Sequence, residues 1–266
     1  TLIRNPQRIS TASLSRAEIA AWGALSPDHE LVRGEIAGPL PLLVLVEQAP
    51  RSQFTDLLRA LQAGAPLPDG LASVALEGRD FKGQRERSWA ALRGNLHLCV
   101  YYRAEIDASR VGVGLTTLPA VATAAAIRQV RPGASAPGIK WVNEILVNGR
   151  KVAGVLTATQ ATGTVIDHVL FCNGVNVAAA PPLDPTPFVP SAGCLDPNLH
   201  WGHLLGHLLE EIDRCYRLLV TQGPAPLLEA YRADALVLNH QVRIWPEGTT
   251  DPAATPPIAE GVVTAI

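Results

Sequence analysis

The sequence predicts a mixed α/β protein built around one large domain, and three observations lead to this fold class. Short apolar segments typical of strands alternate along the 266 residues with longer segments of helical spacing. The dipeptide Asn148-Gly149 separates two apolar runs, which predicts a tight antiparallel hairpin because both turn positions need a positive φ. Hydrophobic residues make up 47% of the chain and charged residues 17%, so it can bury a sizeable core.

Each predicted element follows from the spacing of its apolar side chains. Phe54, Leu57, Leu58 and Leu61 recur at helical intervals, and the Ala-rich segment 115–130 is apolar on all sides, which is typical of a buried helix. The predicted helices cover residues 52–63, 115–130, 199–219 and 227–232. The predicted strands cover residues 41–46, 72–76, 95–102, 166–172, 241–244 and 261–263, together with the two arms of the hairpin.

Composition divides the chain into three parts. Residues 1–41 are mixed and are interpreted as an N-terminal arm, with a short helix at 13–22 that begins with a capping pattern. Residues 42–233 hold most of the predicted elements and form the main domain. Residues 234–266 turn to a β pattern and are interpreted as a small C-terminal β domain that lacks some of its strands.

Charge and cysteine usage narrow the class of protein. The net charge is −2 and the pI about 6.4, which argues against an electrostatic nucleic-acid binder. No apolar run reaches 18 residues and no signal peptide is visible, so we expect no membrane partner and a cytoplasmic protein. Cys99, Cys172, Cys194 and Cys215 are widely spaced without a C-x-x-C pair, so we expect four buried free thiols.

Polar side chains gather around the predicted hairpin. Lys140 precedes its first strand, Asn143-Glu144 enters that strand, and Lys151 opens the second strand. These groups would present cations and a carboxylate to a charged ligand. The alternative is that they are solvated charges beside a surface hairpin. Lys151 lies at a strand edge, where we expect it to need no buried partner for stability.

The hairpin segment, residues 140–156, closely resembles the K-W-P-N-D-I-L-V-N-G-R-K-V-A-G-I-L signature of biotin protein ligases, with fourteen of seventeen positions identical. Two further blocks occur in the order of that family. Residues 81–89 resemble its G-R-G-R-R-G-R-x-W loop and are followed by Gly94-Asn95-Leu96, which is similar to its G-x-N-L. Residues 173–177 resemble its G-I-G-I-N-V strand end, and the whole resemblance covers residues 42–245.

The resemblance implies a biotin protein ligase-like catalytic domain over residues 42–233, with a central mixed sheet and helices packed on one side. A small SH3-like β appendage would begin after it. The implied enzyme uses ATP and Mg²⁺ to activate biotin as biotinyl-AMP. It then transfers the biotinyl group to a lysine of an acceptor of the biotin carboxyl carrier type. No nucleic-acid partner is implied, and an oligomer is compatible with the resemblance.

The resemblance also implies roles for individual residues. Lys151 matches the catalytic lysine that touches the ligand carboxylate, where a cation stabilises the anionic oxygens of the reaction. Lys140 and Asn143 would bind nucleotide, as would Asn176, and Glu144 matches an aspartate associated with Mg²⁺. The remaining ligand-binding positions implied by the resemblance are Ser52, Gly83, Arg85, Arg87, Trp89, Gly94, Asn95 and Gly154.

The loop at 81–89, here called the arginine loop, departs from the family pattern. Gln84 replaces an arginine, and Phe81 and Glu86 replace glycines. Glu86 adds a carboxylate that Arg85 and Arg87 can neutralise by pairing with it. The family's S-T-N motif for the biotin ureido group is reduced to its serine, in Ser52-Gln53-Phe54.

These departures leave alternatives open. A ligase for another carboxylic acid, such as lipoate, is favoured by the altered S-T-N motif and arginine loop. A non-catalytic ligand-binding paralogue is favoured by the lost glycines and opposed by Lys151 and Asn143. A transcriptional regulator is disfavoured because the N-terminal arm is too short for a winged helix.

Overall fold

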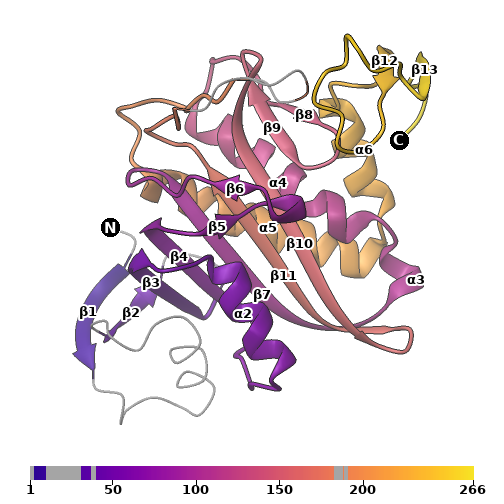
Figure 1. The fold of residues 1–266 in the computed structure, drawn as a ribbon. Coiled ribbons are helices and arrows are strands. Elements are labelled where there is room, and N and C mark those ends of the chain that lie inside the picture. The colour runs from indigo at the N-terminus through magenta and orange to yellow at the C-terminus, as the bar shows by residue number, and fades with distance from the viewer. Residues whose placement is uncertain (1–2, 10–30, 37–39, 183–187, 189–190) are drawn as a thin grey trace.

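The computed structural model describes residues 3–9, 31–36, 40–182, 188 and 191–266 (Figure 1). At its centre is a seven-stranded mixed sheet in the order β3-β4-β7-β11-β10-β9-β8. Only β3 and β4 run parallel, and the other neighbours are antiparallel. Its strands are β3 (Leu42–Ala49), β4 (Leu71–Gly78), β7 (Leu96–Asp107), β8 (Gly138–Lys140), β9 (Glu144–Val147), β10 (Arg150–Thr162) and β11 (Val165–Val175).

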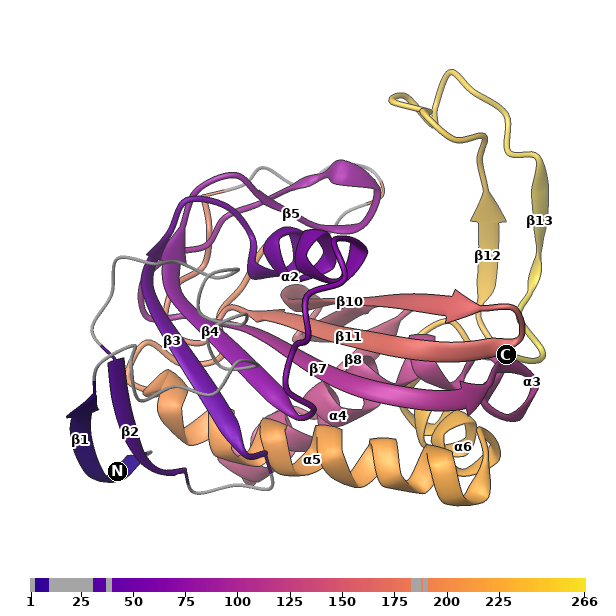
Figure 2. The same cartoon turned by 90° about the horizontal axis from the view of Figure 1, so that it is seen from below.

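Helices cover the two faces of the sheet unequally. One face carries α4 (Gly114–Val130), α5 (Trp201–Gln222) and α6 (Ala225–Asp234), with the short α3 (Ala108–Val111) at an edge. Among the described residues, the other face carries α2 (Gln53–Gln62) and the strands of the arginine loop (Figure 2). The expectation that helices pack on one side is therefore wrong for α2, and its position leaves part of that face available for a pocket.

The hairpin forms as its sequence predicts. β9 and β10 pair in antiparallel register, and the turn residues Asn148 and Gly149 have φ angles of 52° and 69°. Two left-handed residues make the turn whose twist matches that of the flanking strands. The predicted strands and helices of residues 41–232 are all present, and β7 and β11 extend beyond their predicted ends.

The two ends of the chain form small sheets of their own. β1 (Ile3–Ile9) pairs with β2 (Leu31–Ile36), and β12 (Gln241–Ile244) pairs with β13 (Ala259–Val262). The helix predicted at 13–22 lies outside the described residues. The proposed domain boundaries and the SH3-like character of the C-terminal strands stay predictions. Over the described residues, none of the helices combines the length and apolarity that a membrane crossing requires.

The cysteines differ from the expectation of four free thiols. Cys99 on β7 and Cys172 on β11 are directly paired in register and form a disulfide, with their Cα atoms 4.1 Å apart. Cys194 and Cys215 are free, as expected, but only Cys215 is buried, because Cys194 is partly exposed. The sequence hid the disulfide because 73 residues separate its cysteines, and only the pairing of β7 with β11 brings them together.

Candidate active site

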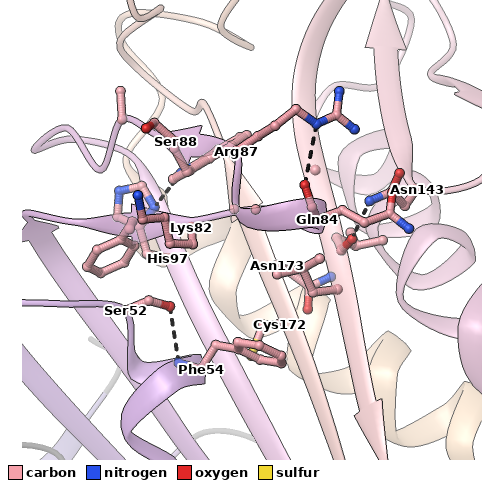
Figure 3. A pocket seen from close by; sticks show the side chains of 18 of the residues that line it. Ser52, Phe54, Lys82, Gln84, Arg87, Ser88, His97, Asn143, Cys172 and Asn173 are labelled. Atoms are coloured by element: carbon pink, nitrogen blue, oxygen red, sulfur yellow. Dashed lines mark hydrogen bonds between the residues drawn. The ribbon is translucent and has the colours of Figure 1, made fainter. Parts of the chain in front are cut away.

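A cavity of about 310 Å³ opens on the face of the sheet that carries α2. Side chains from the start of α2, from β11 and from the arginine loop surround the same space (Figure 3). Nine of the predicted site residues line it: Ser52, Gly83, Arg87, Trp89, Asn143, Glu144, Lys151, Gly154 and Asn176. The structure therefore brings together residues spread over more than a hundred positions of the chain.

A buried carboxylate joins the two lysines of the hairpin. Nζ of Lys151 lies 2.7 Å from Oε1 of Glu144, and Nζ of Lys140 lies 2.7 Å from Oε2 of the same side chain. Glu144 is only 5% exposed, whereas both lysines keep part of their surface in solvent. Two ammonium groups and one carboxylate leave this cluster with one net positive charge, which suits a ligand carrying a single carboxylate.

The protonation of Glu144 follows from these contacts. Burial favours the neutral acid, but the charges and hydrogen bonds of Lys151 and Lys140 outweigh it and hold the pKa of Glu144 below its usual value. The carboxylate is therefore ionised at neutral pH. The expectation that Lys151 needs no buried partner is wrong, because the buried Glu144 pairs with it. The sequence could not show that Glu144 is buried beside Lys151.

Trp89 forms a wall of the cavity against the sheet. A Cβ atom on Gly174 would lie 2.7 Å from its ring, and one on Gly154 would lie 3.3 Å away, so the indole rests on backbone that only glycine leaves open. Nζ of Lys151 lies 5.8 Å from the ring centroid, close enough for a cation–π attraction. Trp89 thus lines the ligand space and helps to place Lys151.

The inner part of the cavity has few polar groups to offer a ligand. Ser52 caps α2 by accepting a hydrogen bond from the backbone N–H of Phe54, and the amide of Gln53 donates to the carbonyl of His97. Burial lowers the pKa of His97 to about 4, although the nearby carbonyl of Leu92 favours its protonated form, so it is neutral at pH 7. The surrounding surface is mostly apolar, with Phe54, Phe81, Leu98, Leu156 and the disulfide.

The arginine loop is built differently from the family pattern. Arg85 and Glu86 have φ angles of 58° and 59°, so a glutamate adopts the left-handed conformation at a position where the family has glycine. Neither Arg85 nor Arg87 pairs with Glu86. Arg85 instead donates to Glu247 between β12 and β13 at 2.9 Å, and Arg87 donates to the carbonyl of Gln84. Arg85 therefore links the loop to the C-terminal strands instead of lining the cavity.

Four predicted site residues lie outside the cavity wall: Lys140, Arg85, Gly94 and Asn95. Asn95 is fully buried and its amide oxygen accepts from the backbone N–H groups of Ala178 and Ala179. Its amide nitrogen donates to the carbonyl of Ala179. Asn95 thus fixes the segment after β11, next to Asn176, and its direct contact with a ligand stays a prediction.

The donor set does not fit a magnesium ion held by protein side chains alone. Both oxygens of Glu144 are engaged by ammonium groups, whereas Mg²⁺ requires free carboxylate or phosphate oxygens. Within the part of the chain that the structure describes, no three His, Cys, Asp or Glu side chains form a metal-binding group. The role of Glu144 as a Mg²⁺ ligand stays a prediction, and the lysines supply the positive charge that the structure does show.

Several cavity residues were not found from the sequence: Gln53, Phe54, Phe81, Lys82, His97, Cys99, Cys172, Asn173 and Gly174. Among them, His97 is buried in the sheet and faces the cavity. Alternation along β7 and β11 gives the relevant signal, because residues two apart share one face of the sheet. To use this alternation, one must also know which face of the sheet the helices cover. A single sequence does not contain that information.

Comparison with known proteins identifies the relatives of this chain. The family described as biotin/lipoate A/B protein ligases matches residues 60–176. A biotin–[acetyl-CoA-carboxylase] ligase of Paracoccus denitrificans is 30% identical, covering 69% of this chain and 78% of that protein. A ligase of the same name from Mycobacterium tuberculosis is 30% identical, covering 75% of this chain and 73% of that protein.

Solved structures show the same fold. The biotin protein ligase of Aquifex aeolicus, in complex with biotin and ATP, superposes with a TM-score of 0.61 at 17% identity, covering 79% of this chain and 84% of that one. The mixed sheet and its helices thus have the architecture of biotin protein ligases. The chain belongs to the biotin/lipoate A/B protein ligase family.

The match does not extend over every relative in full. The bifunctional ligase/repressor BirA of Bacillus subtilis is 28% identical, and the alignment covers 66% of this chain and 55% of that protein. The chain thus spans about half the length of that relative.

Proposed function

We propose that this protein uses ATP to activate biotin, or a closely related cofactor acid, as an acyl adenylate, and passes the acyl group to a lysine of a carrier protein. The observation that carries the proposal is the Lys140–Glu144–Lys151 cluster beside the Trp89 wall. It places a partly buried ammonium, with one net positive charge, in a cavity large enough for a small acid.

The chemistry follows from this charge. The ligand carboxylate attacks the α-phosphorus of ATP, an anhydride bond forms, and pyrophosphate leaves. Two anionic groups must approach, so a fixed cation lowers the barrier by stabilising charge that develops on the transferring oxygens. Lys151 orients the acid, and the amine of the carrier lysine then attacks the acyl carbon and releases AMP.

Two assays test the proposal. Pyrophosphate release is measured with ATP and biotin, and with ATP and lipoate, with magnesium supplied alongside the nucleotide. Calorimetric titration of each acid, with and without ATP, measures binding separately from turnover. Pyrophosphate release that depends on one of these acids supports the proposal, and its absence with both acids contradicts it.

The inner cavity favours lipoate as the second candidate acid. The ureido group of biotin needs several hydrogen-bond partners, yet Ser52 already accepts one hydrogen bond and the amide nitrogen of Gln53 donates one within the protein. The Ser52 hydroxyl proton and the Gln53 amide oxygen remain for a ligand. An apolar ring or chain fits the Phe54, Phe81 and Leu98 surface better. Tighter binding of lipoate than of biotin would select this alternative. Binding of either acid without pyrophosphate release would indicate a non-catalytic paralogue.

A further inference from the structure

The Cys99–Cys172 disulfide lies in the wall of the same cavity that holds Lys151. Both cysteines are more than nine-tenths buried, and the cavity is the open space that borders them. Figure 3 shows Cys172 between Phe54 and Asn173, facing the space that the arginine loop covers. Nothing in the acyl-transfer chemistry uses these sulfur atoms.

The backbone holds the two sulfur atoms together whichever redox state they are in. β7 and β11 pair continuously on both sides of the disulfide, with Ser73 of β4 opposite Cys99 on the next strand. Both strands therefore lie inside the sheet, where hydrogen bonds on each side fix their separation. Reduction cannot move the strands apart without breaking these ladders.

Reduction must instead move the sulfur atoms. Bonded sulfur atoms are about 2.0 Å apart, whereas non-bonded heavy atoms need roughly 3.5–4 Å. On the same face α2 packs over the sheet, and its Leu57 and Leu61 are buried, so a close-packed core fills that side. The open side is the cavity, so at least one thiol turns into the space that a ligand would occupy.

We propose that Cys99 and Cys172 form a reversible thiol–disulfide site that sets the capacity of the pocket: the disulfide form accepts the acid, and the dithiol form binds it more weakly. The reductant is a low-molecular-weight thiol that enters through the cavity. Its thiolate attacks one sulfur and displaces the other cysteine, which takes a proton. A second thiol then resolves the mixed disulfide, so two small thiols become one small disulfide and both cysteines become thiols.

The coupling to ligand rests on the proposed function, and linkage gives it a quantitative test. If the acid binds the disulfide form more tightly, the acid must stabilise the disulfide by the same factor. We expect a ratio of about fivefold or more, the lower end of usual couplings between sites.

The first measurement establishes the redox site itself. Wild-type protein is equilibrated in reduced and oxidised glutathione mixtures, denatured, labelled with a maleimide and weighed intact. Of the four cysteines, only Cys194 and Cys215 lie outside the bridge, so labelling should step from two sites to all four in one two-electron transition. Labelling of all four under every oxidising mixture would overturn the proposal.

The second measurement tests the coupling. Biotin and octanoate are titrated calorimetrically into the oxidised and the reduced protein, and the redox titration is repeated with each acid saturating. Lipoate is left out because its own disulfide would exchange with the cysteines. The ratio of the two affinities should equal the shift of the redox equilibrium.

The outcomes separate this inference from the proposed function. Binding that is equal in both states, or tighter in the dithiol form, overturns the redox site alone. Absence of binding in both states overturns the proposed function with it. As a control, Cys194→Ser should keep the full difference between the states. The double variant Cys99→Ala/Cys172→Ala should show no redox dependence of binding, provided that circular dichroism shows it to be folded. If the double variant is not folded, the titration of the wild-type protein decides the question.

Discussion

The hairpin and the arginine loop line one cavity, and they differ from the family pattern to very different degrees. The hairpin keeps its lysines, its turn and its pairing register. The arginine loop replaces two glycines and one arginine, and two of its residues adopt left-handed backbone. The part of the site that is proposed to bind the acid is therefore preserved, while the part that is proposed to cover the adenylate is altered.

The largest effect is expected from removing the lysine of the hairpin. Lys151→Ala should reduce acid-dependent pyrophosphate release by about 10²–10³-fold, the usual cost of losing one preorganised stabilising group. It should also lower the free energy of unfolding by roughly 1–3 kcal/mol, because the buried carboxylate of Glu144 loses one charged hydrogen bond. The matched control is Arg150→Ala, an exposed cation on the same strand. Release at the parent rate in the lysine variant would show that the hairpin does not activate the acid.

The next effect tests the carboxylate that holds the lysines. Glu144→Gln should lower the free energy of unfolding at pH 7 by roughly 1–3 kcal/mol. Because the pKa of Glu144 in the folded protein lies below its usual value of 4.5, its stabilising contribution is present above that pH and is lost as the pH falls further. The gap between wild type and variant should therefore close below pH 4.5 in urea titrations.

The control for that variant is Glu77→Gln, which removes a surface carboxylate paired with Arg93. An exposed pair of this kind contributes little, so unfolding should change little at either pH. A gap between wild type and Glu144→Gln that stays constant with pH would contradict the ion-pair explanation of the cluster.

A smaller effect is expected from restoring an arginine in the arginine loop. Gln84→Arg restores a guanidinium that can bind phosphate through two hydrogen bonds. It should slow the escape of acyl adenylate into solvent by about tenfold, which corresponds to ~1.4 kcal/mol. The measurement is the rate at which adenylate formed in a single turnover appears outside the protein after rapid filtration. Equal rates would mean that the loop does not cover the intermediate.

The smallest effect concerns the backbone of the loop. Glu86→Gly should tighten ATP binding a fewfold, because it removes a carboxylate from the loop that is proposed to bind the phosphates. It also relieves a left-handed conformation that costs a non-glycine residue roughly 1–2 kcal/mol. Glu105→Gly is the matched control, since Glu105 also has a positive φ but lies on β7, outside the arginine loop. ATP titration at matched magnesium and salt compares the three proteins. Equal gains in both variants would assign the effect to the backbone and not to the site.

By itself the sequence determined most of the local structure. Apolar periodicity predicted the long strands and helices of residues 41–232 but not the short β5, β6, β8 and α3. Asn148-Gly149 specified the turn, because such features depend on neighbours within a few positions. The family blocks also identified the lysines and Trp89 as members of one site. The sequence could not predict which side chains these residues contact, as the buried ion pair of Lys151 with Glu144 shows.

Tertiary structure alone decided the features that depend on which strands are neighbours and which face is covered. The order β7-β11-β10 brings Cys99 beside Cys172 and sets Gly174 under Trp89. The placement of α2 opposite the other helices leaves a largely apolar cavity on that face of the sheet. Such contacts join residues far apart in the chain, and their geometry comes from packing and not from any local pattern.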